Sequence, residues 1–369
     1  MSRTPTYDRR SFLRFGAYGA VGLAGGAVLA ACGSSSKTAS SSTTAAAAAG
    51  ASSTTVASGV TLSNYKMSFQ LSWLKDVEFA GSWIADSMGY YKTNGLDVSL
   101  LAGGPNTAVE PVINQGTALI GLDGIDTISG AINQGSDLKI VGVLFQKNPF
   151  CVVSKAATNI VAPTDLYGKK IGVAAGNLPA WNAFLALNKL DVSKIHVEPA
   201  QFDPTPVATG EFDGQVVFID NEVIQLNEKG VKTATMLFED FNYHLGTDAY
   251  VVQASSLTDP TKRAAIVAFL KAELKGWEYA LANPTVATNL SVNDYGKNTG
   301  LAYTQQLAEM TAQTPLISTP YTTAHGLAYF DSSTTTPWLA TLAASKITAT
   351  AAMFDSSILT EVYQGKSTI

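Results

Sequence analysis

Cysteine and histidine are scarce in this chain, which narrows the chemistry it can perform. Its 369 residues include only Cys32 and Cys151, together with His196, His244 and His325. The histidines are scattered without metal-ligand spacing, so neither a zinc site nor a Cys/His nucleophile pair is expected. Cys151 lies in an apolar strand-like run, which favours burial of its thiol. We therefore predict no metal, no cofactor and no catalytic residue.

Charge is also sparse. Charged residues make up 14% of the chain, and the net charge is −5. Residues 1–31 carry four arginines and one aspartate, a net +3, so the remaining chain carries −8. A mildly acidic surface argues against a nucleic-acid partner. The phosphate-binding pattern GxxxxGK[ST] is missing, so the chain is not expected to hydrolyse ATP.

No strongly apolar run of ~20 residues is present, although one N-terminal segment is weakly hydrophobic. This segment, 15–31, is diluted by glycine and alanine and follows the twin arginines Arg9 and Arg10. We interpret 1–31 as an export signal peptide. It ends in Leu-Ala-Ala-Cys, similar to the lipobox of bacterial lipoproteins, so Cys32 is predicted to carry the lipid rather than to be a chance thiol. The mature protein is then exported and held at the outer face of the cytoplasmic membrane.

Large apolar side chains are nearly missing from residues 32–59, which are rich in serine, threonine and alanine. Such a segment cannot bury enough surface to fold, and we predict a flexible tether. The remaining 60–369 exceed the usual size of one hydrophobic core, which indicates two lobes.

From Tyr65 onward, strand patterns alternate with helix patterns. Apolar residues two apart predict a first strand that ends at Trp73, and a helix is expected over 77–88. Further strands are expected at 96–101, 118–122 and 138–144, with helices at 105–115 and 127–133. This rhythm predicts an α/β fold with a mainly parallel sheet and helices on its faces.

A second unit of the same kind begins near residue 165. A strand is expected at 148–154, where the chain leaves the first unit. The strands of the second unit are expected at 171–174, 196–199 and 215–219, and a strand at 248–252 returns to the first unit. We predict a two-lobed fold in which 60–150 and 246–369 form lobe 1 and 151–245 form lobe 2. Two crossover strands then form a hinge, the architecture of receptors that close around a solute.

Several motifs resemble those of type II periplasmic binding proteins. The branch that they are similar to binds thiamine-pyrimidine precursors, riboflavin, alkanesulfonates, taurine or nitrate. In lobe 1 the motifs are Trp73, 78–81, 89–91, 95–98 and 103–106; in lobe 2 they are 165–173, 202–206, 210–214 and 221–222.

The resemblance implies a fold and a set of partners. It implies a monomeric receptor, not an enzyme, that delivers a small molecule to the permease of an ABC importer with a separate ATPase subunit. Three alternatives stay open: a receptor for an alkanesulfonate, taurine or nitrate, a pyrimidine-synthase-like enzyme, and a lipoprotein that senses a ligand without transporting it.

Five candidate ligand-binding residues lie in lobe 1, each with a structural alternative. Trp73 ends the first strand, where it can stack on a planar ligand or extend the core. Glu78 can accept from ligand N–H groups or interact with the helix dipole. Phe79 can line the pocket or pack on the next turn. Asp123 can bind ligand or cap a helix, and Asn148 can contact ligand or turn the crossover.

Lobe 2 supplies the remaining candidates. Asn177 can cap the helix that follows it or lie at a helix end that binds ligand. Trp181 can form a second aromatic wall or pack inside the lobe. Asp220, Asn221 and Glu222 follow a strand, and three polar residues exceed what one cap needs. With several acids, several aromatics and no certain lysine or arginine, this lining favours a planar nitrogenous ligand, such as a thiamine-pyrimidine precursor or a flavin, over a sulfonate or nitrate.

Overall fold

The structure is a computed structural model that describes residues 59–369, except 105 and 106. The predicted signal peptide, the lipidation at Cys32 and nearly all of the predicted tether lie outside the described residues. None of the helices in the described part of the chain combines the length and the apolar character of a membrane span.

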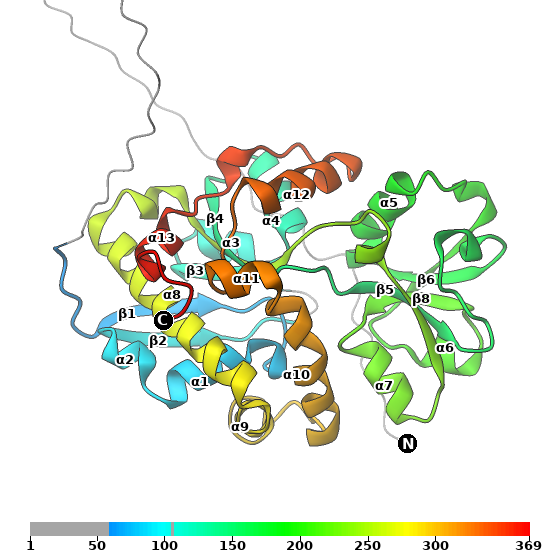
Figure 1. Cartoon of the computed structure of the whole chain (residues 1–369), viewed down its shortest axis with the longest axis horizontal. Coiled ribbons are helices and arrows are strands. Elements are labelled where there is room, and N and C mark those ends of the chain that lie inside the picture. Colours follow the sequence, from blue (N-terminus) through cyan, green and yellow to red (C-terminus); the bar gives the residue numbers. More distant parts are fainter. Residues whose placement is uncertain (1–58, 105–106) are drawn as a thin grey trace, which may run out of the picture. The chain divides into compact units, whose positions relative to one another are not determined.

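The first sheet contains five strands in the order β2-β1-β3-β10-β4 (Figure 1). β1 pairs in parallel with β2 and β3, and β10 is antiparallel to both β3 and β4. The strands are β1 Tyr65–Gln70, β2 Leu96–Leu101, β3 Ile120–Asp123, β4 Leu138–Phe145 and β10 Thr247–Gln253. The predicted parallel pattern is thus interrupted by one antiparallel strand.

The second sheet repeats this arrangement, with the order β7-β6-β8-β5-β9. β6 pairs in parallel with β7 and β8, whereas β5 is antiparallel to β8 and β9. The strands are β5 Phe150–Lys155, β6 Lys170–Ala174, β7 His196–Ala200, β8 Gly214–Phe218 and β9 Thr233–Leu237. Of these, β9 has no counterpart among the strands expected from the sequence.

The chain crosses between the sheets twice, from β4 to β5 and from β9 to β10. The first strand after each crossing, β5 or β10, is the antiparallel strand of its sheet. Two mainly parallel sheets joined by two crossover segments confirm the predicted α/β fold class.

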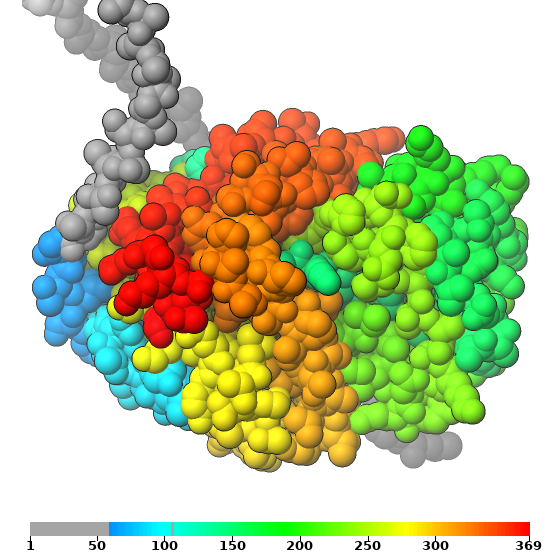
Figure 2. All heavy atoms as spheres, in the orientation of Figure 1, coloured from blue at the N-terminus to red at the C-terminus, as the bar shows by residue number. Residues whose placement is uncertain are grey.

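Helices from both the N-terminal and the C-terminal parts of the chain surround the first sheet (Figure 1). Their bounds are α1 Ala80–Ser87, α2 Tyr90–Thr93, α3 Val109–Asn114, α4 Ile125–Asn133, α8 Pro260–Ala282, α9 Pro284–Leu290, α10 Tyr303–Ile317, α11 Pro320–His325, α12 Ser332–Ala344 and α13 Ser357–Tyr363. The second sheet has α5 Leu178–Leu187, α6 Thr205–Thr209 and α7 Glu222–Glu228. On the face shown in Figure 2, atoms of α10 and α12 adjoin those around the second sheet.

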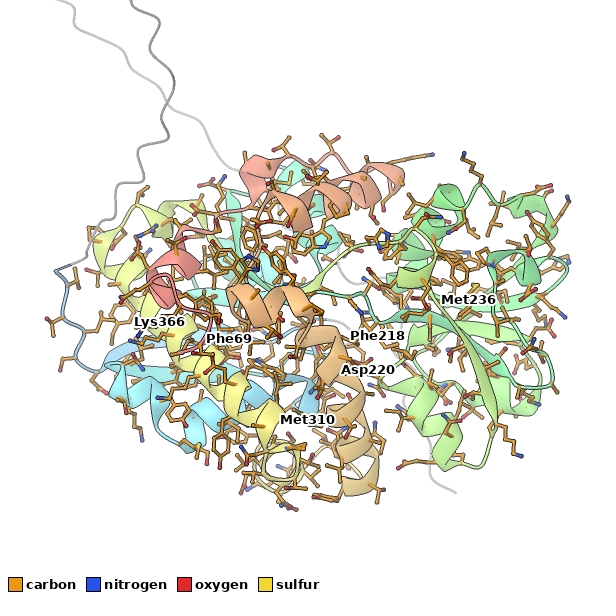
Figure 3. The ribbon with its side chains drawn as sticks, viewed as in Figure 1. Phe69, Phe218, Asp220, Met236, Met310 and Lys366 are labelled. Atoms are coloured by element: carbon orange, nitrogen blue, oxygen red, sulfur yellow. The ribbon has the colours of Figure 1, made fainter. Side chains whose placement is uncertain are left out.

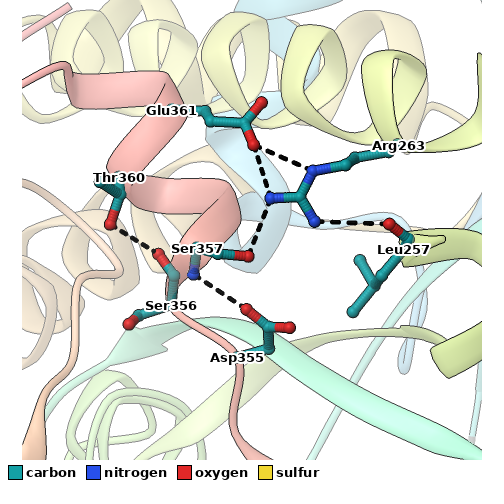
Figure 4. A network of polar contacts seen from close by, with 7 residues as sticks. All are labelled: Leu257, Arg263, Asp355, Ser356, Ser357, Thr360 and Glu361. Carbon is teal, nitrogen blue, oxygen red and sulfur yellow. Dashed lines mark hydrogen bonds and ion pairs between the residues drawn. The ribbon is translucent and has the colours of Figure 1, made fainter. Parts of the chain in front are cut away.

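The last helix is tied to the first-sheet body by a charged network (Figure 4). The Arg263 Nε on α8 donates to Glu361 Oε1 on α13 at 2.9 Å, and Arg263 Nη2 donates to Ser357 Oγ at 2.9 Å. Phe354 also forms a parallel bridge with Ile140 of β4. The Thr/Ala-rich C-terminal stretch, 321–369, is therefore an integral part of this body.

Helices α1 and α8 approach so closely at Gly81 and Gly276 that neither glycine has room for a side chain. A Cβ added at Gly276 on α8 would lie 2.1 Å from the Gly81 carbonyl oxygen on α1. We expect Gly276→Ala to lower the free energy of unfolding by about 1–3 kcal/mol, because backbone atoms cannot move aside as a flexible side chain can. Chemical denaturation measures this loss. The matched control is Gly130→Ala on α4, where no atom lies within 4 Å of the added Cβ. An equal loss in both variants would contradict the explanation.

Candidate functional site

A cavity of about 300 Å³ lies between the two sheets, and residues of both sheet regions line it. It is found where β1, β3, β6, β7 and β8 end, the edge at which open parallel sheets bind ligands. The antiparallel strands β5 and β10 begin at this same edge. The lining residues are Ser72, Trp73, Glu78, Gly104, Thr107, Asp123, Gly124, Asp126, Thr127, Phe150, Gly176, Asn177, Phe202, Phe218, Asn221, Glu222, Thr247 and Asp248.

Two aromatic pairs line this cavity. Trp73, beyond the end of β1, meets Phe202, beyond the end of β7, with ring centroids 5.3 Å apart and an edge-on angle of 66°. Phe150 on β5 lies opposite Phe218 on β8 in the ladder, with centroids 4.7 Å apart at 79°. Edge-to-face pairs leave part of each ring face free to contact a ligand. The first pair also joins the two sheet regions directly.

Trp73 reaches the cavity because β1 ends earlier than the alternation predicts. The strand stops at Gln70, whose side-chain amide donates to the carbonyl oxygens of Leu71 and Ala102 at 2.9 and 3.2 Å. Beyond this point the chain turns, and the Asp76 side chain accepts from the backbone N–H of Glu78 at 3.0 Å. A short 3-10 turn, Val77–Phe79, then precedes α1.

Helix α10 holds this turn in place. Gln306 on α10 accepts from the backbone N–H of Val77 at 2.7 Å, and Gln313 donates to the Val77 carbonyl oxygen at 3.0 Å. Gln306 also donates to Glu309 at 2.8 Å. The position of Glu78 in the cavity therefore depends on residues more than 200 positions further along the chain.

The polar lining is dominated by acids. Five carboxyl side chains line the cavity, namely those of Glu78, Asp123, Asp126, Glu222 and Asp248. Among the described lining residues, none is lysine, arginine or histidine. Buried carboxylates are costly unless they are paired with a positive charge or neutralised by protons.

The pKa values of these acids are raised accordingly. Burial raises the pKa of Glu78 well above its ordinary range, and the neighbouring carboxylates of Asp248 and Asp76 raise it further. Burial and Glu110 raise the pKa of Asp123 to about 8. The pKa of Asp248 is raised well above its usual range by burial first and then by Asp220. At neutral pH this cavity holds protons or binds a cation more readily than it holds five negative charges.

Two of these acids already have good backbone donors, whereas two others do not. Gly124 N–H donates to Asp123 at 2.7 Å, and Phe218 N–H donates to Glu222 at 3.0 Å. Glu78 accepts only a long 3.4 Å bond from Ser72. Asp248 is 6% exposed, and its Oδ2 has no hydrogen-bond partner.

Of the ten ligand-binding residues predicted from the sequence, the structure brings six to this cavity. Whether they contact a ligand stays a prediction. The six are Trp73, Glu78, Asp123, Asn177, Asn221 and Glu222.

The other four do not line the cavity. Phe79 is 1% exposed and packs edge-on against Trp83, because the 3-10 turn directs Glu78 to the cavity and Phe79 to the core. Trp181 is 1% exposed and packs near Phe184 and Phe238 inside the second-sheet region, so it is not an opposing wall.

Asn148 and Asp220 lie close to the cavity but behind its lining. Asn148 donates to the Leu245 carbonyl oxygen at 2.8 Å and accepts from Phe150 N–H at 2.9 Å, so it joins the two crossover segments. Asp220 is 5% exposed, and its Oδ1 has no partner. It follows β8, next to Phe218, between the second sheet and α10 (Figure 3).

Sequence reasoning missed three aromatic residues and two acids of the lining, namely Phe150, Phe202, Phe218, Asp126 and Asp248. Asp248 and Phe150 lie at the start of antiparallel strands, whereas the candidates predicted from strand positions lie at strand ends. An antiparallel strand begins at the edge where its parallel neighbours end. Candidates taken from the starts of antiparallel strands as well would therefore have included both residues. Asp248 also has a positive φ of 50°, which the pattern of residues does not reveal.

Comparison with known proteins places the chain in a family. The sequence model described as NMT1/THI5 like matches residues 76–287, more than half of the chain. The chain belongs to the NMT1/THI5-like family. This match confirms the predicted family resemblance, since it includes the motifs between residues 78 and 222.

This NMT1/THI5-like protein is 24% identical over 241 residues to riboflavin-binding protein RibY of Chloroflexus aurantiacus. The match covers 62% of this chain and 66% of RibY. The alkanesulfonate-binding protein SsuA of Xanthomonas axonopodis pv. citri, bound to MOPS, superposes with a TM-score of 0.58 at 13% identity, over 79% of this chain and 99% of SsuA. The desulfurization enzyme DSZB superposes with a TM-score of 0.56 at 12% identity, over 82% and 99%. At these identities the two structures show the shared fold alone.

Proposed function

We propose that this protein is an extracytoplasmic solute-binding receptor of an ABC importer. It captures a small planar nitrogenous molecule, similar to a thiamine-pyrimidine precursor or a flavin, between lobe 1 (60–150 and 246–369) and lobe 2 (151–245). The observation that carries the proposal is the cavity at the strand ends of both sheets, with two aromatic pairs and five carboxyl groups. Family membership and the similarity to RibY support it.

The wider proposal includes the anchor and the partners. The protein is exported, is lipid-anchored through Cys32, acts as a monomer and delivers its ligand to a permease with a separate ATPase. Ligand binding shifts the lobes toward a closed form to the extent that the ligand prefers that form. The Trp73–Phe202 contact across the two lobes is one of the contacts that closure provides.

Two alternatives are less well supported. An alkanesulfonate, taurine or nitrate would meet five carboxyl groups in a lining whose described residues include no cation. The second alternative is an enzyme, since DSZB shares the fold. However, Cys151, the one described thiol, is fully buried in the second-sheet core and is not accessible as a nucleophile.

The test is a thermal-shift and calorimetric screen of the purified protein against aminopyrimidines, flavins, alkanesulfonates, taurine and nitrate. We expect micromolar or tighter binding of at least one heterocycle, with a raised melting temperature. Binding of a sulfonate or nitrate but of no heterocycle would overturn the proposed ligand class. Release of a modified product from the heterocycle would instead favour an enzyme.

A further inference from the structure

No positively charged side chain in the described lining balances the carboxyl groups of the cavity. Glu78, Asp123, Asp126 and Asp248 come from the first-sheet region, and Glu222 faces them from the second. The other polar side chains in the described lining are hydroxyls and amides, which donate hydrogen bonds but carry no charge. Behind the lining, Asp220 adds a further buried carboxyl rather than a cation.

Asp248 provides a second observation, independent of the number of acids. Its side chain is more than nine-tenths buried, it lines the cavity, and its Oδ2 accepts no hydrogen bond. An unpaired buried acceptor is unusual in folded proteins, because nothing replaces the water that it loses. The backbone also adopts a positive φ of 50° at this residue, a conformation that is uncommon for side chains other than Asn and Asp. The missing partner is a donor that enters the cavity.

The available hydrogen bonds indicate where that donor is placed. Asp123 and Glu222 each accept a short bond from a backbone N–H, so part of their charge is already stabilised. Glu78 has only the 3.4 Å bond from Ser72, and after burial the carboxylate of Asp248 contributes most to its raised pKa. The gap between Glu78 and Asp248 is therefore the strongest acceptor region of the cavity.

The geometry favours an organic cation over a metal ion. Among the residues that the structure describes, no group of three or more His, Cys, Asp or Glu side chains is arranged to hold a metal ion. The aromatic pairs Trp73–Phe202 and Phe150–Phe218 offer ring faces that attract a cation. A cavity of about 300 Å³ also accommodates a small organic molecule.

We propose that the ligand is a planar organic cation, such as an amidinium or a protonated amino-heterocycle, whose charged N–H groups bind between Glu78 and Asp248 while its ring contacts the aromatic pairs. This inference rests on the proposed receptor function and adds the charge of the ligand. A flavin, which is neutral, satisfies the proposed function but not this inference.

The experiment compares three probes with the same ring and different charges: benzamidine, benzamide and benzoate. Isothermal titration calorimetry of the purified protein at neutral pH measures each affinity. We expect benzamidine to bind at least about tenfold more tightly than benzamide, and benzoate not to bind. Equal or tighter binding of benzamide or benzoate overturns the inference, and so does a failure of benzamidine to bind at millimolar concentration.

The same titrations with riboflavin and 4-aminopyrimidine test the receptor function separately from the charge of its ligand. If riboflavin binds while benzamidine shows no advantage over benzamide, the receptor function stands and the cation inference fails. If neither heterocycle nor benzamidine binds but an alkanesulfonate does, the proposed function itself fails.

A charge-removing variant tests the assigned position. Asp248→Asn keeps the shape of the side chain, and we expect it to reduce the benzamidine-to-benzamide affinity ratio to within about threefold. The matched control is Asp97→Asn on the exposed face of β2, which should leave the ratio unchanged. Should Asp248→Asn not fold, Glu78→Gln replaces it. An unchanged ratio in the folded variant overturns the assignment of Asp248.

Discussion

Glu78→Gln is expected to weaken ligand binding and to stabilise the unliganded protein at the same time. Burial and the carboxylates of Asp248, Asp76 and Glu309 raise the pKa of Glu78 well above its ordinary range. Glutamine removes the source of that repulsion but keeps the size of the side chain. A hydrogen bond to a charged group contributes about 1.5–3 kcal/mol, so loss of the carboxylate should weaken binding about tenfold to a hundredfold.

The gain in stability depends on pH. When Glu78 is protonated it resembles glutamine, so the variant and the wild type should unfold alike in acid. As pH rises above about 4, the carboxyl ionises in the unfolded chain while the folded protein still holds its proton. The wild type therefore loses stability that the variant keeps, at about 1.4 kcal/mol per pH unit, until the folded carboxyl ionises too. Denaturant unfolding at several pH values measures this difference, and calorimetry with the tightest compound from the screen measures affinity.

Glu273→Gln on α8 is the matched control, since Glu273 is also a carboxylate with hydroxyl donors, is 1% exposed and does not line the cavity. Its carboxylate accepts from Ser82 at 2.8 Å and from the Tyr250 and Tyr91 hydroxyls. The amide group of glutamine cannot accept all three bonds, so this variant should lose stability and keep its affinity. If Glu78→Gln behaves like Glu273→Gln, then Glu78 is a structural residue and not a ligand contact.

The opposite effects expected at Glu78 and Glu273 reflect where each acid finds its donors. Glu273 is satisfied by three hydroxyl groups inside one body of the protein. Glu78 and Asp248 lie at a gap between two bodies, and the protein supplies only a weak partner to one of them. Stability lost at a site of this kind is recovered when a ligand binds, which is why functional sites tolerate such groups.

Much of the fold could be predicted from the sequence because the two periodicities are local. Apolar residues two apart marked β1. The strand β9, Thr233–Leu237, escaped detection because its residues are mostly half-buried and give no clear alternation. The end of β1 was also misplaced. It is set by the Gln70 side chain and by contacts with α10, which are distant in sequence.

The sequence predicts which residues line the cavity only where the order of strands and helices alone decides their position. Glu78 and Asp123 follow parallel strands and therefore reach the sheet edge. The helix α5 is apolar on nearly all sides, so its sequence cannot show whether Trp181 faces the cavity or the core. The pairing of Trp73 with Phe202 joins two segments from different sheet regions, and no local pattern reports such a contact.

The unliganded protein is expected to lose stability as pH rises from about 4 to about 8. Burial is the main cause that raises the pKa of Asp76 and of Asp220 to about 7, and burial together with Glu110 raises that of Asp123 to about 8. In the unfolded chain these acids ionise near pH 4. A raised pKa in the folded state means that the folded protein holds its protons more tightly. The stabilisation is therefore complete below about pH 4 and is lost as pH rises toward about 8.

Each such group contributes a slope of about 1.4 kcal/mol per pH unit within its window, so one group alone lowers the stability by several kcal/mol. Denaturant unfolding across this pH range measures it. Asp220→Asn removes one of these groups. Between about pH 4 and 7 the loss of stability per pH unit should therefore become smaller by about 1.4 kcal/mol. Asp203→Asn is the control. Hydrogen bonds from Thr205 lower the pKa of Asp203, so this substitution should change the slope of stability against pH only at acidic pH. A saturating organic cation should make the unfolding free energy depend less on pH, because it takes the place of the protons bound to the acids of the cavity. A stability that is constant or rises with pH would show that the buried acids are compensated in solution, and it would remove the electrostatic reason for a cationic ligand.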